Sequence, residues 1–169
     1  MRKRSRASAR APAISILIDE PRWREDVSVR RLIRRAVRLA LGGEGQGDDR
    51  GLTILLTNDA RLRALNARFR SKRKPTNVLS FPAADDAADL GDIAMAYGVV
   101  KREAKAQKKS LAAHAAHLAV HGTLHLRGFN HEKARQAQVM EALETAILAK
   151  LGIADPYATR PYTKAGKAA

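Results

Sequence analysis

The feature that most constrains this fold is the stretch of residues 111–126, in which no side chain is charged at neutral pH. It is apolar on nearly all sides, a pattern that predicts a helix buried in the middle of a domain. Gly128 follows it, and glycine readily takes the left-handed conformation with which many helices end. We therefore expect a central buried helix that ends just before Gly128.

All five histidines of the chain lie between His114 and His131. Four share one face of the predicted helix at spacings of three, four and four residues: His114, His117, His121 and His125. His121 and His125 are one turn apart and can aim two ring nitrogens at one metal ion. After the glycine the chain can reverse and bring in His131. The pattern predicts a metal site of His121, His125 and His131 with one position open for water.

The histidine pattern has two alternative interpretations, core packing and a metallopeptidase site. Buried imidazoles can be hydrogen-bonded core groups, and His114 and His117 fit a packing or supporting role better than direct ligation. The histidine and glycine spacing also matches the metalloprotease pattern H-E-x-x-H-x-x-G-x-x-H, but Gly122 stands where that pattern has its general-base glutamate. A peptidase would need its base elsewhere.

The charge balance indicates a polyanionic partner. The chain carries 32 Lys and Arg against 17 Asp and Glu, a net charge of +15, and such a field attracts nucleic acid. Five of these cations lie in residues 1–10, so +10 remains for the rest of the chain. Cysteine is absent, which excludes disulfides, thiolate zinc sites and cysteine nucleophiles and suits a reducing compartment.

The order of predicted elements indicates an α+β domain. Strands are expected at 13–18, 52–56, 77–81 and 92–96, and helices at 28–40, after Asn58 or Thr57 to about residue 69, and over most of 97–150 with breaks near 110 and 128–130. We expect a small mixed β-sheet packed against a helical layer. The predicted organisation is a disordered basic arm (1–12), a single metallohydrolase domain (13–153) and a loose C-terminal tail (154–169).

The helix expected at 28–40 has an apolar side and a side of arginines. Such a face is either simply solvated or a contact for RNA. The N-terminal run 13–18 is too short for a signal peptide, and no other segment is long and apolar enough to span a membrane. We expect a cytoplasmic protein, although an organellar transit peptide is a second interpretation of the basic start.

Five stretches together resemble the YbeY family of bacterial endoribonucleases, and the likeness covers nearly the whole chain. They are 65–70 (LNARFR), 74–82 (KPTNVLSFP), 90–93 (LGDI), 121–131 (HGTLHLRGFNH) and 140–144 (MEALE). The histidine string also occurs in other hydrolases, but a chain in which it follows the PTNVLSFP stretch is typical of this family.

The resemblance implies a zinc-dependent, single-strand-directed ribonuclease, with one Zn²⁺ per chain, acting on RNA of the small ribosomal subunit. The expected roles are 16S rRNA 3′-end maturation and ribosome quality control, with ribosomal or assembly proteins as further partners. It assigns the metal to His121, His125 and His131 and a functional role to Arg70, so Arg70 and the metal-bound His121 are the expected catalytic residues. The family usually has Tyr-Asp where this chain has Phe129-Asn130.

The sequence does not distinguish between two nucleophiles, an activated water and the 2′-hydroxyl of the RNA itself. Arg70 would stabilise negative charge on the phosphate in either case. Two other function classes stay open at this point. One is a non-catalytic RNA-binding assembly factor with a structural metal, and the other is a metallopeptidase.

Overall fold

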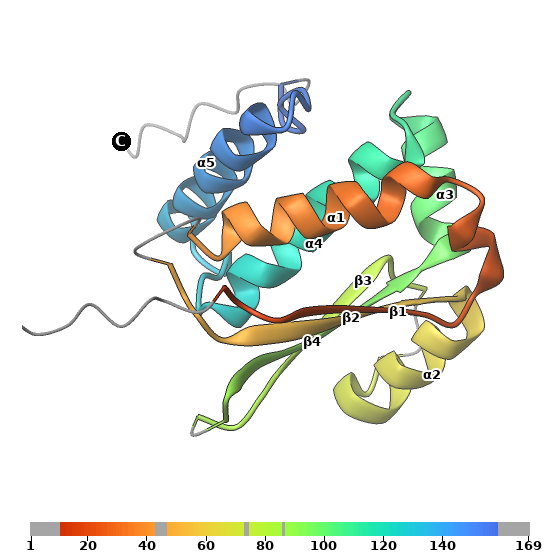
Figure 1. The fold of residues 1–169 in the computed structure, drawn as a ribbon, viewed down its shortest axis with the longest axis horizontal. Helices are drawn as coiled ribbons and strands as arrows, with labels where there is room; N and C mark the ends of the chain where they lie inside the picture. The colour runs from red at the N-terminus through yellow and green to blue at the C-terminus, as the bar shows by residue number, and fades with distance from the viewer. Residues whose placement is uncertain (1–10, 43–46, 73–74, 86, 159–169) are drawn as a thin grey trace, which may run out of the picture.

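The computed structural model describes residues 11–42, 47–72, 75–85 and 87–158, and within them one sheet is surrounded by helices (Figure 1). The strands are β1 (Ile14–Ile18), β2 (Gly51–Thr57), β3 (Val78–Pro82) and β4 (Asp89–Ala96). The helices are the 3-10 helix η1 (Pro21–Arg24) and the α-helices α1 (Val27–Ala40), α2 (Asp59–Arg70), α3 (Tyr97–Ala106), α4 (Leu111–Leu126) and α5 (Ala134–Lys150). The predicted element order is confirmed.

The sheet is mixed, as predicted. Its strand order is β1-β2-β4-β3. The first three strands in this order are parallel, with Ile54 paired to Ile16 on one side and to Ile93 on the other, and β3 runs antiparallel to β4 at the edge. The three isoleucines continue one another across the sheet, and all but Ile16 are fully buried. The sheet therefore offers a continuous apolar surface to the helices.

The helices α1 and α4 lie side by side on one face of the sheet, and α5 packs against both of them (Figure 1). The prediction of a helical layer with a central buried helix is confirmed, because α4 contacts α1, α3, α5, β3 and β4. One feature differs from the expected single layer, since α2 covers the opposite face of the sheet. An apolar stripe in the sequence indicates that a helix is packed, but it does not indicate which face of the sheet the helix covers.

Side chains cap the starts of two helices, and a glycine follows the end of one of them. Asn58 caps α2 by accepting from the backbone N–H of Arg61 at 2.9 Å, and Ser110 caps α4 by accepting from Ala113 at 3.0 Å. Gly128 has φ +93°, a backbone conformation that side chains with a Cβ rarely adopt. The chain turns there towards the third predicted ligand. Among the described residues, no helix is both long and apolar enough to cross a membrane.

The 3-10 helix η1 anchors the entry to α1 through Trp23, where the sequence pattern predicts only a turn. The indole is fully buried, donates from Nε1 to the carbonyl of Thr57 at 3.0 Å and meets the Tyr97 ring edge-on at a centroid distance of 5.2 Å. The indole thereby joins the end of β2 to the start of α3. The boundaries predicted at residues 12 and 153 stay predictions, and residues 1–10 and 159–169 lie outside the described residues.

We expect Trp23→Phe to lower the free energy of unfolding by about 1–3 kcal/mol, because the buried carbonyl of Thr57 loses its donor. Urea unfolding followed by circular dichroism measures this, since Trp23 is the only tryptophan and its own fluorescence is lost. Leu17→Ala is the control, because Leu17 is 56% exposed and should change stability by no more than about 0.5 kcal/mol. Equal stability of wild type and Trp23→Phe would contradict the anchoring role.

Candidate metal centre

The structure brings together the three histidines that the sequence predicts. His121 and His125 project from α4 and His131 comes from the loop before α5, and one ring nitrogen of each lies within 4.8 Å of the others. Among the described residues, these three histidines form the group of three or more His, Asp or Glu side chains that lie close enough together to hold a metal ion. His131 is exposed and the other two are half-buried, so the site opens to solvent.

Hydrogen bonds on the far side of two rings orient the cluster. His121 Nδ1 donates to Glu144 Oε1 at 2.7 Å, and His125 Nδ1 donates to the carbonyl of Phe129 at 3.0 Å. With both Nδ1 atoms occupied as donors, both neutral rings carry their lone pair on Nε2. The structure therefore aims towards one point two nitrogens that could bind a metal ion.

The spacing of these nitrogens fits a bound cation. His121 Nε2 and His125 Nε2 are 3.0 Å apart, close to the separation of about 3.3 Å between two ligands of a tetrahedral zinc ion at bond lengths of about 2.0–2.1 Å. Two lone pairs facing each other repel unless a cation or a proton lies between them. Three imidazoles and no thiolate or carboxylate form a donor set that suits Zn²⁺, with a fourth position left open.

The protonation state of His125 supports the same interpretation. Burial, together with the neighbouring His121 and His131, lowers the pKa of His125 to about 4. The ring is therefore neutral at physiological pH. Neutral imidazole is the form that binds metal, so no proton has to be displaced from His125 first.

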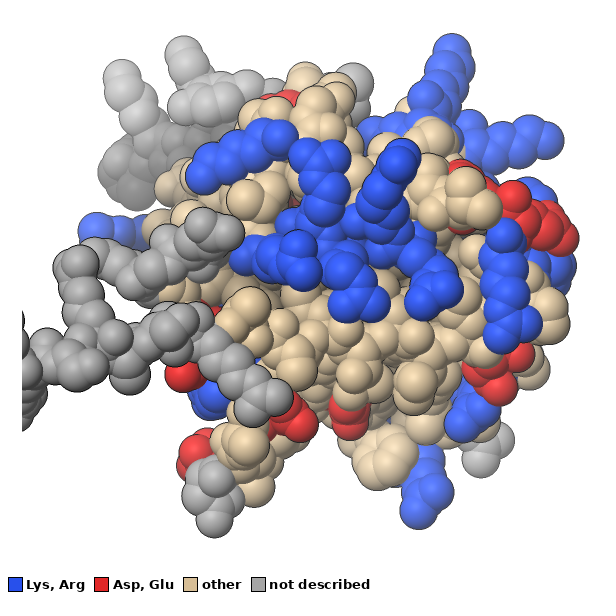
Figure 2. All heavy atoms as spheres, in the orientation of Figure 1, with Lys and Arg blue, Asp and Glu red and all other residues tan. Residues whose placement is uncertain are grey.

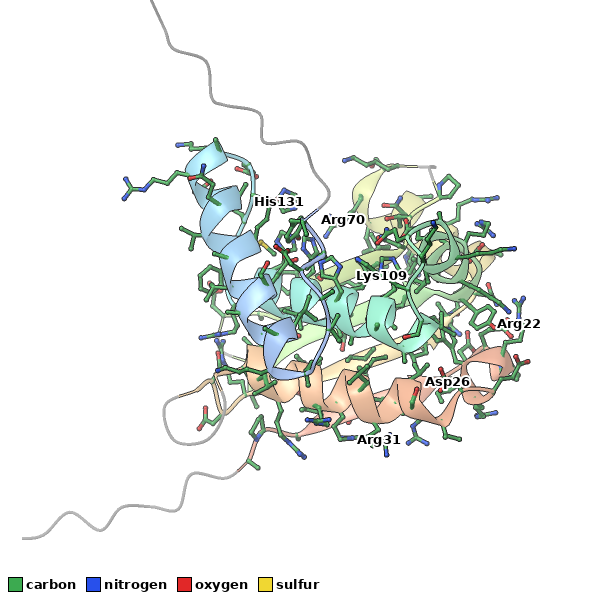
Figure 3. All side chains as sticks on the ribbon, turned by 90° about the horizontal axis from the view of Figure 1, so that it is seen from above. Arg22, Asp26, Arg31, Arg70, Lys109 and His131 are labelled. Atoms are coloured by element: carbon green, nitrogen blue, oxygen red, sulfur yellow. The ribbon has the colours of Figure 1, made fainter. Side chains whose placement is uncertain are left out.

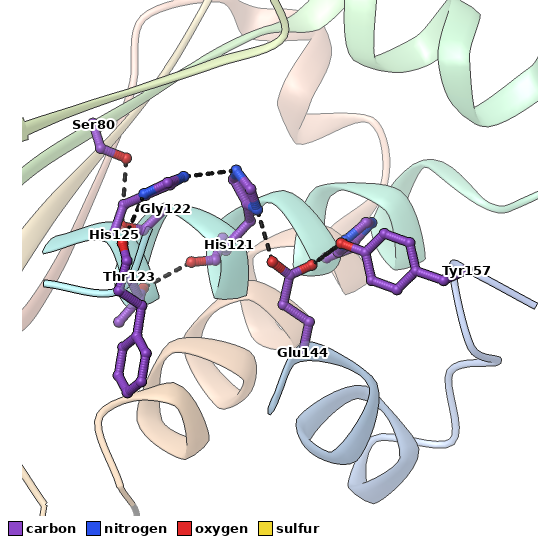
Figure 4. A network of polar contacts seen from close by, with 10 residues as sticks. Ser80, His121, Gly122, Thr123, His125, Glu144 and Tyr157 are labelled. Atoms are coloured by element: carbon purple, nitrogen blue, oxygen red, sulfur yellow. Dashed lines mark hydrogen bonds and ion pairs between the residues drawn. The ribbon is translucent and has the colours of Figure 1, made fainter. Parts of the chain in front are cut away.

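A buried carboxylate supports the cluster from behind, as Figure 4 shows. Glu144 of α5 is 1% exposed and accepts from His121, from His117 Nε2 at 2.8 Å and from the hydroxyl of Tyr157. Burial raises the pKa of Glu144, but the hydrogen bonds from His117, His121 and Tyr157 outweigh it and hold the pKa at about 2. Glu144 is therefore an anion that fixes the orientation of the His121 ring.

Gly122 allows α4 to approach the sheet beside the ligands. A Cβ at this position would lie 3.0 Å from both Ser80 Oγ and Ile93 Cδ1, tighter than ordinary contact. The hydroxyl of Ser80 donates to the carbonyl of Gly122 at 3.4 Å, so β3 and α4 also meet through a polar contact. The position that holds a glutamate in the metalloprotease pattern thus faces the sheet, and a side chain there would require Ser80 and Ile93 to move.

The first two histidines of α4 stay outside the cluster. His114 Nε2 donates to Glu103 Oε2 at 2.7 Å, and the same oxygen accepts from Asn77 Nδ2 at 2.9 Å. His117 shares Glu144 with His121 and so supports a ligand without being one. The predicted distinction between the triad and the two earlier histidines agrees with these contacts.

Arg70 is the last residue of α2 and reaches the edge of the sheet. Its Nη2 donates to the carbonyl of Ser80 at 2.9 Å, and Figure 3 shows Arg70 and His131 on the same side of the molecule. The preceding Phe69 is 58% exposed and meets the Phe81 ring edge-on at a centroid distance of 5.4 Å.

Sequence reasoning did not single out Glu144 or Tyr157 as supporting residues. Glu144 has one visible signal, a carboxylate with apolar residues on both sides, Leu143 and Leu148 among them. Tyr157 lies in the segment predicted to be a loose tail, and nothing in the local sequence links it to α4. Asn130, the departure from the usual family pattern, buries its Oδ1 without a hydrogen-bond partner among the described residues.

Comparison with known proteins agrees with these features. The family model described as Endoribonuclease YbeY matches residues 18–152. A protein named Endoribonuclease YbeY from Nitrobacter winogradskyi is 46% identical over 157 residues, covering 87% of this chain and 83% of the relative. The protein of the same name from Chelativorans is 46% identical over 158 residues, covering 90% of this chain and 97% of the relative.

The fold has a solved counterpart. A Thermotoga maritima protein, known from a solution structure, aligns over 83% of this chain and 92% of its own with a TM-score of 0.53 and 20% sequence identity. At this identity the likeness shows the shared fold alone.

We expect Glu144→Gln to weaken zinc binding by about 10- to 100-fold, because the neutral amide cannot accept from His117 and His121 as the carboxylate does. Titration of the apoprotein with zinc against a competing chelator measures the affinity. The matched control is Glu103→Gln, which alters the other Glu–His pair but touches none of the three ligands. Equal zinc affinity of Glu144→Gln and wild type would show that the carboxylate does not support the site.

Proposed function

This chain belongs to the endoribonuclease YbeY family, and from that membership we propose that it is a zinc-dependent endoribonuclease that cleaves single-stranded RNA. The observation that carries the proposal is the cluster of three imidazoles, two of them with Nδ1 bonded to protein acceptors and Nε2 directed inwards. His121, His125 and His131 would hold the ion. A zinc ion held by three neutral ligands supplies Lewis acidity, which stabilises charge on a phosphoryl oxygen and activates water near neutral pH.

The side chains of this protein would orient the reacting phosphate. Arg70 is held at the β3 edge by its bond to Ser80, and Ser80 in turn contacts α4 at Gly122. A planar guanidinium in this position binds the non-bridging oxygens of a phosphate and stabilises the extra negative charge of the transition state. Lys72, exposed after the end of α2, adds attraction to the backbone that depends on salt.

The preference for single strands is supported by the exposed ring beside Arg70. Phe69 is 58% exposed and the guanidinium of Arg68 lies 5.2 Å from its centre. An unpaired base can stack on such a ring, and a base inside a duplex cannot. His131 is exposed and the other two histidines are half-buried, and an open site of this kind suits a polymer.

The attacking group is either water or the 2′-hydroxyl of the RNA itself. Internal attack leaves a 2′,3′-cyclic phosphate on the product, whereas direct attack by water does not. Analysis of the cleaved ends by mass spectrometry therefore separates the two mechanisms.

The two other function classes have less support. A structural zinc site is usually closed by four protein ligands, and the described residues offer three here. A peptidase lacks its glutamate base, because Gly122 stands at that position and packs closely against Ser80 and Ile93. The proposed role in the cytoplasm, in 16S rRNA 3′-end maturation and ribosome quality control with ribosomal or assembly proteins as partners, rests on the family alone.

We expect His125→Ala to lose both bound zinc and RNA cleavage, because one of three ligands is removed. The measurement is metal content of the freshly purified protein together with cleavage of an unstructured RNA oligonucleotide. The control is wild-type protein stripped by a chelator, which should lose cleavage and regain it with added zinc. Cleavage that survives in His125→Ala or after stripping would refute the zinc-dependent enzyme, and zinc without cleavage in wild type would favour the assembly factor.

We expect Arg70→Ala to slow cleavage by about 100-fold while the zinc content stays at the wild-type level, because the guanidinium acts on the phosphate and not on the metal. Single-turnover cleavage at saturating enzyme measures the rate. Arg63→Ala is the matched control, an exposed arginine two turns earlier on α2, and should cleave at the wild-type rate. A similar loss in both variants would mean that only general charge matters.

A further inference from the structure

The outer face of α1 is an arginine face, defined by Arg30, Arg31, Arg34, Arg35 and Arg38. Arg34 is half-buried and the other four are exposed. The helix contains no acidic residue, and Figure 2 shows the arginines as a continuous basic surface with the acidic side chains at its margins.

The arginine face is not neutralised by the protein. Elsewhere in the described chain, arginines form ion pairs with carboxylates: Arg22 with Glu20, Arg50 with Asp48, Arg61 with Asp19 and Arg102 with Asp59. No residue of the arginine face does so among the described residues, where Arg34 instead donates a hydrogen bond to the carbonyl of Ile14. Like charges that crowd together without partners raise the energy of the folded protein. A bound polyanion would remove that cost.

The opposite side of α1 rules out a membrane as the favoured partner. Val29, Ile33 and Val37 are fully buried against the domain core, so the apolar side of the helix is not available to enter a lipid layer, as membrane-surface helices require. The arginine face is therefore presented to water by a helix that is already packed.

The shape of the surface fits phosphates better than unpaired bases. A hollow of about 490 Å³ lies at the start of α1 and is lined in part by Arg30, Arg31 and Arg34. Its one aromatic residue, Trp23, is fully buried, so no ring is available for base stacking. From Arg30 to Arg38 the arginines extend over about 12 Å of helix. Guanidinium groups along such a line can each pair with a phosphate.

The arginine face lies apart from the candidate metal centre. Figure 3 shows Arg31 on one side of the molecule and Arg70 and His131 on the other, and α4 and α1 pack side by side between the two. A short RNA segment at the histidines therefore does not reach these arginines.

We propose that the arginine face of α1 is a second RNA-binding surface, which holds the sugar–phosphate backbone of a double-stranded RNA element. The choice of RNA over other polyanions rests on the proposed function. Duplex RNA is recognised chiefly through its shape, phosphates and 2′-hydroxyls, which matches a surface rich in arginine and without exposed aromatic rings. The surface would anchor structured RNA independently of the single strand at the metal centre.

The test compares two triple variants of the full chain that remove the same charge. One carries Arg31→Gln, Arg35→Gln and Arg38→Gln, and leaves Arg34 because of its bond to Ile14. The control carries Arg63→Gln, Lys105→Gln and Lys150→Gln, all exposed positions on other helices. Glutamine has nearly the helix propensity of arginine and lysine, and circular dichroism checks that both variants are folded.

Binding of a labelled RNA duplex of about 16 base pairs is measured by fluorescence anisotropy over a series of salt concentrations. We expect the α1 variant to lose affinity on the order of tenfold at 100 mM salt and its slope of log K against log salt to fall by about two to three. The control variant should lose less than about twofold. Cleavage of a short unstructured oligonucleotide should be the same in the α1 variant and the wild type.

Duplex affinity that is unchanged in the α1 variant, or reduced equally in the control, overturns the proposal. So does a loss of binding to phosphatidylserine vesicles in the α1 variant while duplex binding is unaffected, since that outcome identifies a membrane partner. A wild-type protein that cleaves no RNA refutes the proposed enzyme but not this surface, because duplex binding is measured without any cleavage.

Discussion

The burial of α4 on nearly all its sides is the constraint on which the rest of this structure depends. Small side chains make it possible, because Ala115, Ala116 and Ala119 are fully buried and let the neighbouring helices and the sheet approach closely. Gly122 brings the helix still nearer to β3 and β4. A helix held this tightly has little freedom to rotate, so the two imidazoles at its C-terminal end keep a fixed spacing without any contribution from a bound ion.

Polar groups in this interior are tolerated because they satisfy one another. Glu144 is an anion that water hardly reaches, and burying such a charge costs several kcal/mol unless hydrogen bonds replace its hydration. His117, His121 and Tyr157 supply those bonds. The network joins α4, α5 and the segment after α5, so the packing of the C-terminal part of the domain is linked to the orientation of His121 in the candidate metal centre.

The positive charge of the protein is divided between different tasks. Arg61 and Arg102 are paired with carboxylates and join α2 to its neighbours. Arg70 lies at the edge of the sheet, on the same side of the molecule as His131 (Figure 3), and the proposed function assigns its guanidinium to a single phosphate. Among the described residues, the arginine face of α1 forms no ion pair with a carboxylate. The cations behind the net charge of +15 are therefore distributed over several surfaces with different chemistry.

The sequence by itself determined the elements, the central helix and the identity of the three clustered histidines, because these follow from short-range periodicity. A buried helix needs an uncharged stretch, and ligands one turn apart must face the same way. Tertiary structure alone decided that α2 covers the far face of the sheet, that Phe69 is exposed, and that Glu144 and Tyr157 support the site. Each depends on contacts between segments distant in the chain, and the local sequence carries no record of which distant group will fill a given space.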